Sequence, residues 1–207
     1  RSAQELSKER KAAATTLQGG IEEILKTLAM SKAEFSVQVE QKQSSRGRPV
    51  CGPTGIDKVA FMISPNPGEP LKPLTSIASG GEISRVMLAI KSVLAASDTV
   101  STLVFDEIDT GVGGEVAVAI GDHLSGLAGH TQVLAITHLA SIAARADRHV
   151  RIEKHLSETR TVVGAQALVE EERVEEIARM LSGDKEAEVS LNHAKELLSR
   201  YTKGKLS

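Results

Sequence analysis

The sequence predicts an α/β protein built around a mainly parallel sheet. From residue 79 onward, segments with helical spacing of apolar residues alternate with short, continuously apolar segments, in the order helix, strand, helix, strand. Continuously apolar strands joined by a helical crossover are typical of parallel strands buried on both faces. With 207 residues, 41% of them hydrophobic, the chain is long enough to bury such a core in one domain or in two small ones.

Residues 1–30 are expected to form one long amphipathic helix. The apolar positions recur at helical spacing, at Leu6, Ala13, Leu17, Ile21, Ile24 and Leu28. The segment begins without a capping residue, and each glycine of the Gly19-Gly20 pair weakens a helix interior by about 1 kcal/mol. We therefore expect a helix that enters from elsewhere and is kinked or interrupted at the two glycines.

Two half-buried strands are predicted next, because apolar and polar residues alternate in two segments. The apolar positions are Phe35, Val37 and Val39, and then Val59, Phe61 and Ile63. A loop rich in glycine, proline, serine and arginine separates them at residues 43–56, so the pair should be antiparallel. The proline-rich residues 65–70 predict an extended connector.

The αβαβ region consists of a helix at residues 83–94, a strand at 103–105, a helix at 116–127 and a strand at 133–136. Beyond it we expect a short helix at 139–144, a hairpin from strands 149–154 and 160–169, and helices at 170–182 and 186–200. Gly183 should end the first of these two helices. The acidic side chains at its start predict a solvated face; they are Glu170, Glu171, Glu172, Glu175 and Glu176.

Composition excludes several classes of protein. The formal charge of -2 shows no global excess of base, so any contact with DNA must be local. Aromatic residues are scarce, which disfavours single-strand binding by base stacking. Cys51 is the only cysteine and no secretory signal opens the chain, so a reducing cytoplasm is expected. No apolar run is long enough for a membrane span.

The first candidate site is Ser79-Gly80-Gly81-Glu82, ahead of an apolar helix. A capping box, with Ser79 at the N-cap and Glu82 reaching back to it, explains two of the four residues. Two glycines leave bare N–H groups at the positive end of the helix dipole, where an anion can approach closely. The motif is therefore consistent both with a helix N-terminus and with a phosphate-binding site.

The second candidate site is the pair Asp106-Glu107, which follows an apolar strand at the edge where α/β sheets bind ligands. Asp106 is placed to hold Mg²⁺, and Glu107 to orient or deprotonate a water that attacks a phosphoryl group. The alternative is a polar turn before the next helix, with Asp109 or Thr110 as its cap. That alternative leaves the two acids unexplained.

The third candidate is His138, immediately after the next apolar strand. In neighbouring parallel strands this places the histidine beside the acids, within reach of a terminal phosphate. The histidines show no zinc-ligand spacing. A phosphate loop of the form G-x-x-x-x-G-K-[ST] does not occur, so half of a nucleotide site is missing from the chain.

These motifs, in this order, resemble the signature, Walker B, D-loop and H-loop of ABC-type ATPases. Residues 65–74, 77–91, 105–112 and 171–181 are, more specifically, similar to the RecN family of bacterial SMC-like DNA repair ATPases. The resemblance covers nearly the whole chain. It implies the C-terminal lobe of an ABC-type, P-loop NTPase head, with antiparallel strands at the edge of the sheet. Residues 1–31 would be the end of a coiled-coil helix, and residues 32–207 the lobe itself.

The resemblance also implies roles, partners and a compartment. Asp106 would bind Mg²⁺, Glu107 the attacking water and His138 the γ-phosphate of ATP on the same head. Ser79, Gly80, Gly81 and Glu82 would reach ATP on a second head, and Asp109 in the D-loop would couple the two sites. The partners would be the upstream Walker A lobe, a second head and DNA, in the cytoplasm at the nucleoid. The chain alone should be inactive, because the Walker A lobe is absent.

A different class of function stays open. A non-enzymatic assembly or DNA-bridging module could use the first helix, the acidic helix and the basic loop that carries Lys42, Arg46 and Arg48. The Asp106-Glu107 pair argues against this reading. A transporter ATPase subunit is a further alternative, which the coiled-coil-like opening fits poorly.

Overall fold

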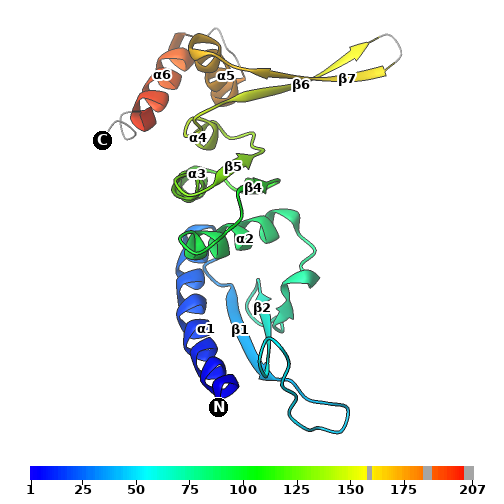
Figure 1. Cartoon of the computed structure of the whole chain (residues 1–207). Coiled ribbons are helices and arrows are strands. Elements are labelled where there is room, and N and C mark those ends of the chain that lie inside the picture. The colour runs from blue at the N-terminus through cyan, green and yellow to red at the C-terminus, as the bar shows by residue number, and fades with distance from the viewer. Residues whose placement is uncertain (158–159, 184–187, 203–207) are drawn as a thin grey trace.

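The computed structural model describes residues 1–157, 160–183 and 188–202, and the elements follow one another along an elongated molecule (Figure 1). The first helix, α1 (Ser2–Thr27), packs against β1 (Glu34–Gln41) and crosses α2 (Gly80–Leu94). It runs without interruption through the glycine pair, so the predicted interruption is wrong. A Cβ at Gly20 would lie 3.3 Å from both methyl groups of Val93 in α2. The glycine therefore serves the close approach of two helices and does not break one.

The first sheet is antiparallel, as predicted. Strand β1 pairs with β2 (Asp57–Ser64), with Phe35 opposite Ile63 and Val37 opposite Phe61. The predicted extended connector is wrong: residues 66–69 form a turn, in which Gly68 has a φ of +86° and the Ser64 hydroxyl donates to two carbonyl groups. The chain then folds back as β3 (Lys72–Pro73), which pairs with β2, and as a short 3-10 helix, η1 (Leu74–Ser76).

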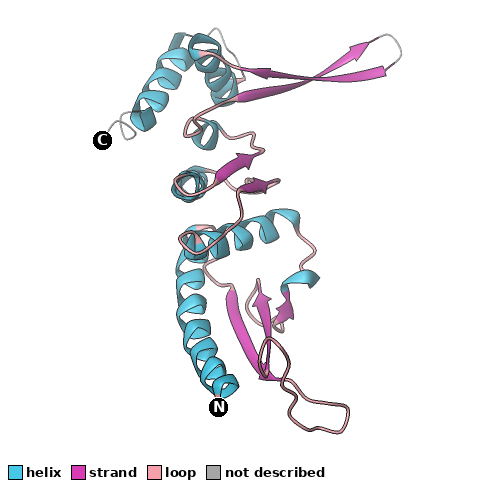
Figure 2. Cartoon of the chain, viewed as in Figure 1, coloured by secondary structure: helices cyan, strands magenta, loops and turns pink. Residues whose placement is uncertain are grey.

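The αβαβ region is confirmed in its order. Helix α2 leads to β4 (Thr102–Phe105), α3 (Gly114–Ala128) and β5 (Gln132–Ala135), and β4 and β5 pair in parallel. Within the described residues this parallel sheet has only two strands, and the antiparallel strands form separate sheets (Figure 2). A mainly parallel sheet with antiparallel strands at its edge is therefore not what this part of the chain contains.

Burial of the parallel sheet on both faces is also wrong. One face contributes Phe105 to a core shared by α1, α2, α3 and β1. On the other face Val104, Leu134 and Ile136 remain 64%, 51% and 60% exposed. No described element covers this side, so the apolar face of the two strands lies open to solvent.

The last third of the described chain forms a second, smaller core. This core is formed by α4 (Ala140–Ala143), α5 (Glu170–Ser182) and α6 (Glu188–Thr202). The antiparallel hairpin of β6 (Val150–Ser157) and β7 (Arg160–Ala167) lies between α4 and α5 in the chain and contributes none of its described residues to it. The predicted hairpin and helices are confirmed, although residues 186 and 187 of the predicted last helix lie outside the described residues. Gly183 ends α5 in the left-handed conformation, with a φ of +78°. Among the described residues, no helix has both the length and the apolar character needed to span a membrane.

One side chain of the predicted solvated acidic face behaves differently. Glu176 is buried and accepts hydrogen bonds from the Arg179 guanidinium at 2.6 and 2.9 Å. These bonds hold the pKa of the Glu176 carboxyl below its usual range. The prediction of a fully solvated face is wrong at this position, because helical periodicity turns Glu176 toward the small core while the preceding acids stay outside.

Candidate nucleotide-binding site

The N-terminus of α2 carries the first candidate motif. Ser79 is the N-cap, and its hydroxyl oxygen accepts from the backbone N–H of Glu82 at 3.4 Å. The reciprocal bond, in which the Glu82 carboxylate would accept from the backbone N–H of Ser79, is not among the hydrogen bonds of the described residues, so only half of the predicted capping box is present. Gly80 and Gly81 form the first turn, and their N–H groups lie at the positive end of the helix.

A carboxylate of the same chain lies against this helix end. A Cβ at Gly80 would overlap Oε2 of Glu107, so the side chain of Glu107 rests directly on the glycine. Glu107 has a φ of +56°, in the left-handed region that non-glycine residues seldom adopt. The backbone N–H of Glu107 donates to Oδ1 of Asp106 at 2.9 Å. The Glu107 side chain therefore covers the end of α2 in this structure, and a phosphate site at the two glycines stays a prediction.

Hydrogen bonds join α2 to the segment after β4. The Ser84 hydroxyl donates to the carbonyl oxygen of Asp106 at 2.7 Å, and Nη1 of Arg85 donates to the carbonyl oxygen of Thr110 at 3.2 Å. A Cβ at Gly81 would lie 3.1 Å from the carbonyl oxygen of Glu107. The signature-like motif and the acidic pair thus form one packed unit, and the absence of a side chain at Gly81 permits the close approach.

Arg85 lies buried between these two segments. Its Nε has no hydrogen-bond partner among the described residues, and burial lowers the pKa of its guanidinium. Sequence reasoning did not single out Arg85. The sequence signal for Arg85 is a cation on the helix face that also carries Gly81, Leu88 and Ala89, which are small or apolar.

Asp109 connects the acidic segment to the histidine. Its carboxylate is buried, and Oδ2 accepts from the Thr137 hydroxyl at 2.5 Å and from the backbone N–H of His138 at 2.8 Å. Nδ1 of His138 lies 3.0 Å from the same oxygen. Asp109 and Thr110 do not cap the next helix, since α3 begins at Gly114 with Gly113 as its N-cap. The loop between them places Asp109 for a bridge to the end of β5.

This contact orients His138. A carboxylate oxygen only accepts, so Nδ1 of the imidazole carries the hydrogen, and Nε2 is the ring atom left for a ligand. The side chain is 71% exposed, although Asp109 is buried beneath it. Thr137 supports the arrangement, because its hydroxyl also accepts from the backbone N–H of Leu139 at 3.0 Å. The role of Thr137 as a support was missed at the level of sequence.

The chemistry of the site fits a magnesium nucleotide better than a protein-enclosed metal. No group of three or more histidine, cysteine or carboxylate side chains able to hold a metal occurs in the described residues. Mg²⁺ is normally held by one or two carboxylates together with phosphate oxygens and water. The exposed carboxylate of Asp106 is a ligand of this kind.

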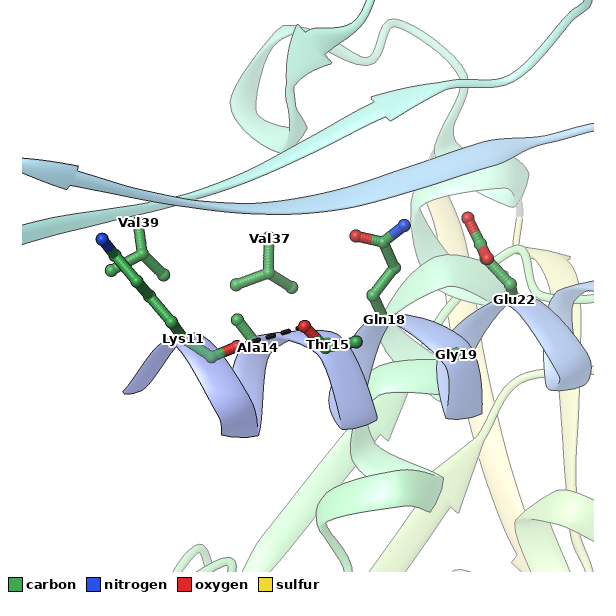
Figure 3. A pocket seen from close by; sticks show the side chains of 8 residues that line it. All are labelled: Lys11, Ala14, Thr15, Gln18, Gly19, Glu22, Val37 and Val39. Carbon is green, nitrogen blue, oxygen red and sulfur yellow. Dashed lines mark hydrogen bonds between the residues drawn. The ribbon is translucent and has the colours of Figure 1, made fainter. Parts of the chain in front are cut away.

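An open groove elsewhere on the molecule contains none of the motif residues. It lies between α1 and β1, and Figure 3 shows its walls, formed by Lys11, Ala14, Thr15, Gln18, Gly19 and Glu22 from the helix and Val37 and Val39 from the strand. At the candidate nucleotide site, Asp106, Glu107 and His138 are exposed.

Curated proteins similar to this chain are DNA repair proteins named RecN. The one from Treponema pallidum (strain Nichols) is 50% identical over 193 residues, which are 93% of this chain and 34% of that protein. The one from Bacillus subtilis (strain 168) is 44% identical over 204 residues, 94% of this chain and 35% of that protein. The chain thus spans about a third of the length of the curated relatives it matches. No protein-family model matches it.

Solved structures support the fold. The Smc head domain with a coiled coil and joint from Pyrococcus yayanosii superposes with a TM-score of 0.53 at 16% identity, covering 94% of this chain and 30% of that one. The Smc head domain from Pyrococcus furiosus, bound to the C-terminal domain of ScpA, gives a TM-score of 0.50 at 18% identity, covering 77% of this chain and 36% of that one. The fold is thus α/β and SMC head-like. By sequence, the chain belongs to the RecN family of DNA repair proteins.

Proposed function

We propose that this chain is the C-terminal part of an ATPase head that acts in the repair and recombination of DNA double-strand breaks. The proposal rests on one observation: hydrogen bonds connect the start of α2, the acidic segment after β4 and the histidine after β5. Ser84 and Arg85 bind the carbonyl groups of the acidic segment, and Asp109 binds His138. A helix N-terminus, adjacent carboxylates and an oriented imidazole are among the groups that can serve phosphoryl transfer.

Each group has a distinct task in this proposal. Asp106 holds Mg²⁺, which would screen the negative charge of the phosphates. Glu107 leaves its resting place on Gly80 and orients the attacking water, accepting its proton. His138 presents Nε2 to the γ-phosphate and donates to it when the ring is doubly protonated. The freed N–H groups of Gly80 and Gly81, with the Ser79 hydroxyl and the nearby Glu82, meet the ATP of a second head.

The upstream Walker A lobe completes the site and covers the open sheet face. Val104, Leu134 and Ile136 provide an apolar surface that such a lobe would bury. Residues 1–31 lead into the coiled coil, and residues 32–207 form the lobe. ATP between two heads favours their engagement and hydrolysis releases them, with Asp109 coupling the two sites. DNA is held by the dimer, and the chain alone is inactive.

The test is ATP binding and hydrolysis by this chain alone and after mixing with the upstream lobe, each with native Glu107 and with Glu107→Gln. The amide keeps the size of the side chain and cannot accept a proton. We expect no ATP hydrolysis by the chain alone and ATP hydrolysis by the mixture. The mixture with Glu107→Gln should bind ATP but not hydrolyse it. Glu115→Gln is the matched control, because Glu115 is an exposed acid in the first turn of α3.

Two results would contradict the proposal. One is a folded mixture that neither binds nor hydrolyses ATP, which would favour the non-enzymatic assembly or DNA-bridging module. The other is a Glu107→Gln variant that turns over ATP as fast as the Glu115→Gln control, which would remove Glu107 from the reaction.

A further inference from the structure

The segment between β1 and β2 is an ordered, projecting turn. Backbone hydrogen bonds continue the ladder beyond the two strands, from Lys42 N to the carbonyl of Ile56 at 2.7 Å and from Val50 N to the carbonyl of Lys42 at 2.9 Å. The tip is closed by a bond from Ser44 N to the carbonyl of Arg48 at 2.8 Å, with Gly47 at a φ of +71°. Figure 1 shows this loop extending beyond the sheet, away from α2.

The tip concentrates positive charge. Residues 41–56 contain Lys42, Arg46 and Arg48 and no acidic residue, although the whole chain has a formal charge of -2. Arg46 and Arg48 are exposed, and within the described residues neither guanidinium has a hydrogen bond or an ion pair. Lys42 is held in the loop by a hydrogen bond from Nζ to the Thr54 hydroxyl at 3.0 Å. The two arginines flank Gly47 on a turn whose backbone is fixed.

The side chains at the tip of the loop favour a partner that carries phosphate groups. Two guanidinium groups with no acceptor in the protein suit phosphate oxygens, which they can bind bidentately. The serines and Gly47 keep the tip narrow, so its backbone can approach a polyanion closely. Residues 41–56 contain no aromatic side chain, which removes the stacking on which single-strand binding relies. These properties fit contacts with the phosphate backbone of a duplex.

We propose that the loop at residues 42–56 is a contact for the phosphate backbone of double-stranded DNA, with Arg46 and Arg48 as the phosphate ligands. The choice of DNA as the polyanion rests on the proposed function. The contact carries no sequence specificity, because charge and reach are all that the loop offers. The loop is separate from the acidic pair and His138, so DNA binding and ATP hydrolysis can be measured independently.

The first experiment measures binding of a labelled duplex by the full-length protein across a salt titration, without nucleotide. For Arg46→Gln with Arg48→Gln, losing two phosphate contacts should make the log–log salt slope shallower by about 1.8 and weaken binding roughly tenfold at physiological salt. Arg46→Lys with Arg48→Lys should keep most of the slope, because the charge remains. Lys32→Gln with Lys195→Gln removes two exposed cations elsewhere and should leave binding close to the wild type.

The second experiment needs no variant of the loop. Cys51 is exposed three positions beyond Arg48, so bound duplex should slow its alkylation, measured by peptide mass spectrometry, and high salt should restore the rate. Unchanged duplex affinity in the glutamine variant, an equal loss in the control variant, a loss confined to single strands, or alkylation unaffected by duplex would each overturn the proposal. Wild-type protein that binds duplex through this loop but hydrolyses no ATP would instead refute the proposed function alone.

Discussion

Asp109→Ala, which removes the whole carboxylate, should destabilise the protein far more than Asp109→Asn, which removes only its charge. Oδ2 alone receives the Thr137 hydroxyl, the His138 backbone N–H and the His138 ring. Asp109→Ala leaves the first two donors without their acceptor in a half-buried place. At about 1.5 kcal/mol for each bond to a charged group, the free energy of unfolding should fall by roughly 3 kcal/mol. Asp109→Asn can keep an oxygen at the same point and should cost about 1 kcal/mol.

The assay is urea unfolding followed by circular dichroism, with the m-value checked for constancy. Asp106→Ala is the control, because that neighbouring carboxylate is exposed and accepts only the Glu107 backbone N–H in the described structure. Equal losses for Asp109→Ala and Asp109→Asn would refute the role of a single shared acceptor oxygen. A loss for Asp109→Ala no larger than that of the control would refute the whole network.

Two further predictions concern buried charges. Arg85→Met removes a buried guanidinium whose Nε has no partner among the described residues, but it also removes the hydrogen bond from Nη1 to the Thr110 carbonyl. Because these effects oppose each other, the free energy of unfolding should fall by no more than about 1.5 kcal/mol, and a larger fall would contradict this. Glu176, whose pKa is lowered first by its hydrogen bond from Arg179, contributes stability that is present above the usual glutamate pKa of about 4.3 and lost as the pH falls through the lower folded pKa. The free energy of unfolding should therefore depend less steeply on pH in acid for Glu176→Gln than for the wild type. The same pH dependence in both proteins would contradict this assignment.

Local patterns predicted the identity of most elements. Alternation in the segments around Phe35 and Phe61 gave the antiparallel pair, and the continuous apolar runs gave β4 and β5 as parallel neighbours. Because the strand ends determine where polar residues emerge, the sequence also predicted that His138 would lie near the acidic segment. The acid it meets is Asp109, whose identity depends on the loop before α3.

The errors arose where tertiary contacts decide the conformation. Gly20 looks like a helix breaker in sequence, but the missing Cβ is what allows Val93 to pack against α1. The prolines of residues 65–70 suggested an extended chain, whereas Gly68 and the Ser64 hydroxyl turn it back onto β2. The apolar runs of β4 and β5 predicted burial on both faces, but periodicity cannot say whether the covering layer belongs to the same stretch of chain.

The motif segments are held by hydrogen bonds within this chain, whereas the apolar face of the parallel sheet is exposed. The hydrogen bonds that position the motifs run between residues of this chain, from Ser84 to Asp106 and from Thr137 to Asp109. What the described residues leave incomplete is apolar, on the sheet face that carries Leu134 and Ile136. Burying a side chain of that size contributes about 1.5 to 3 kcal/mol. Under the proposed function, the sheet face would supply the driving force for joining the upstream lobe, whereas Glu107 would still have to move off Gly80 before it could orient a water.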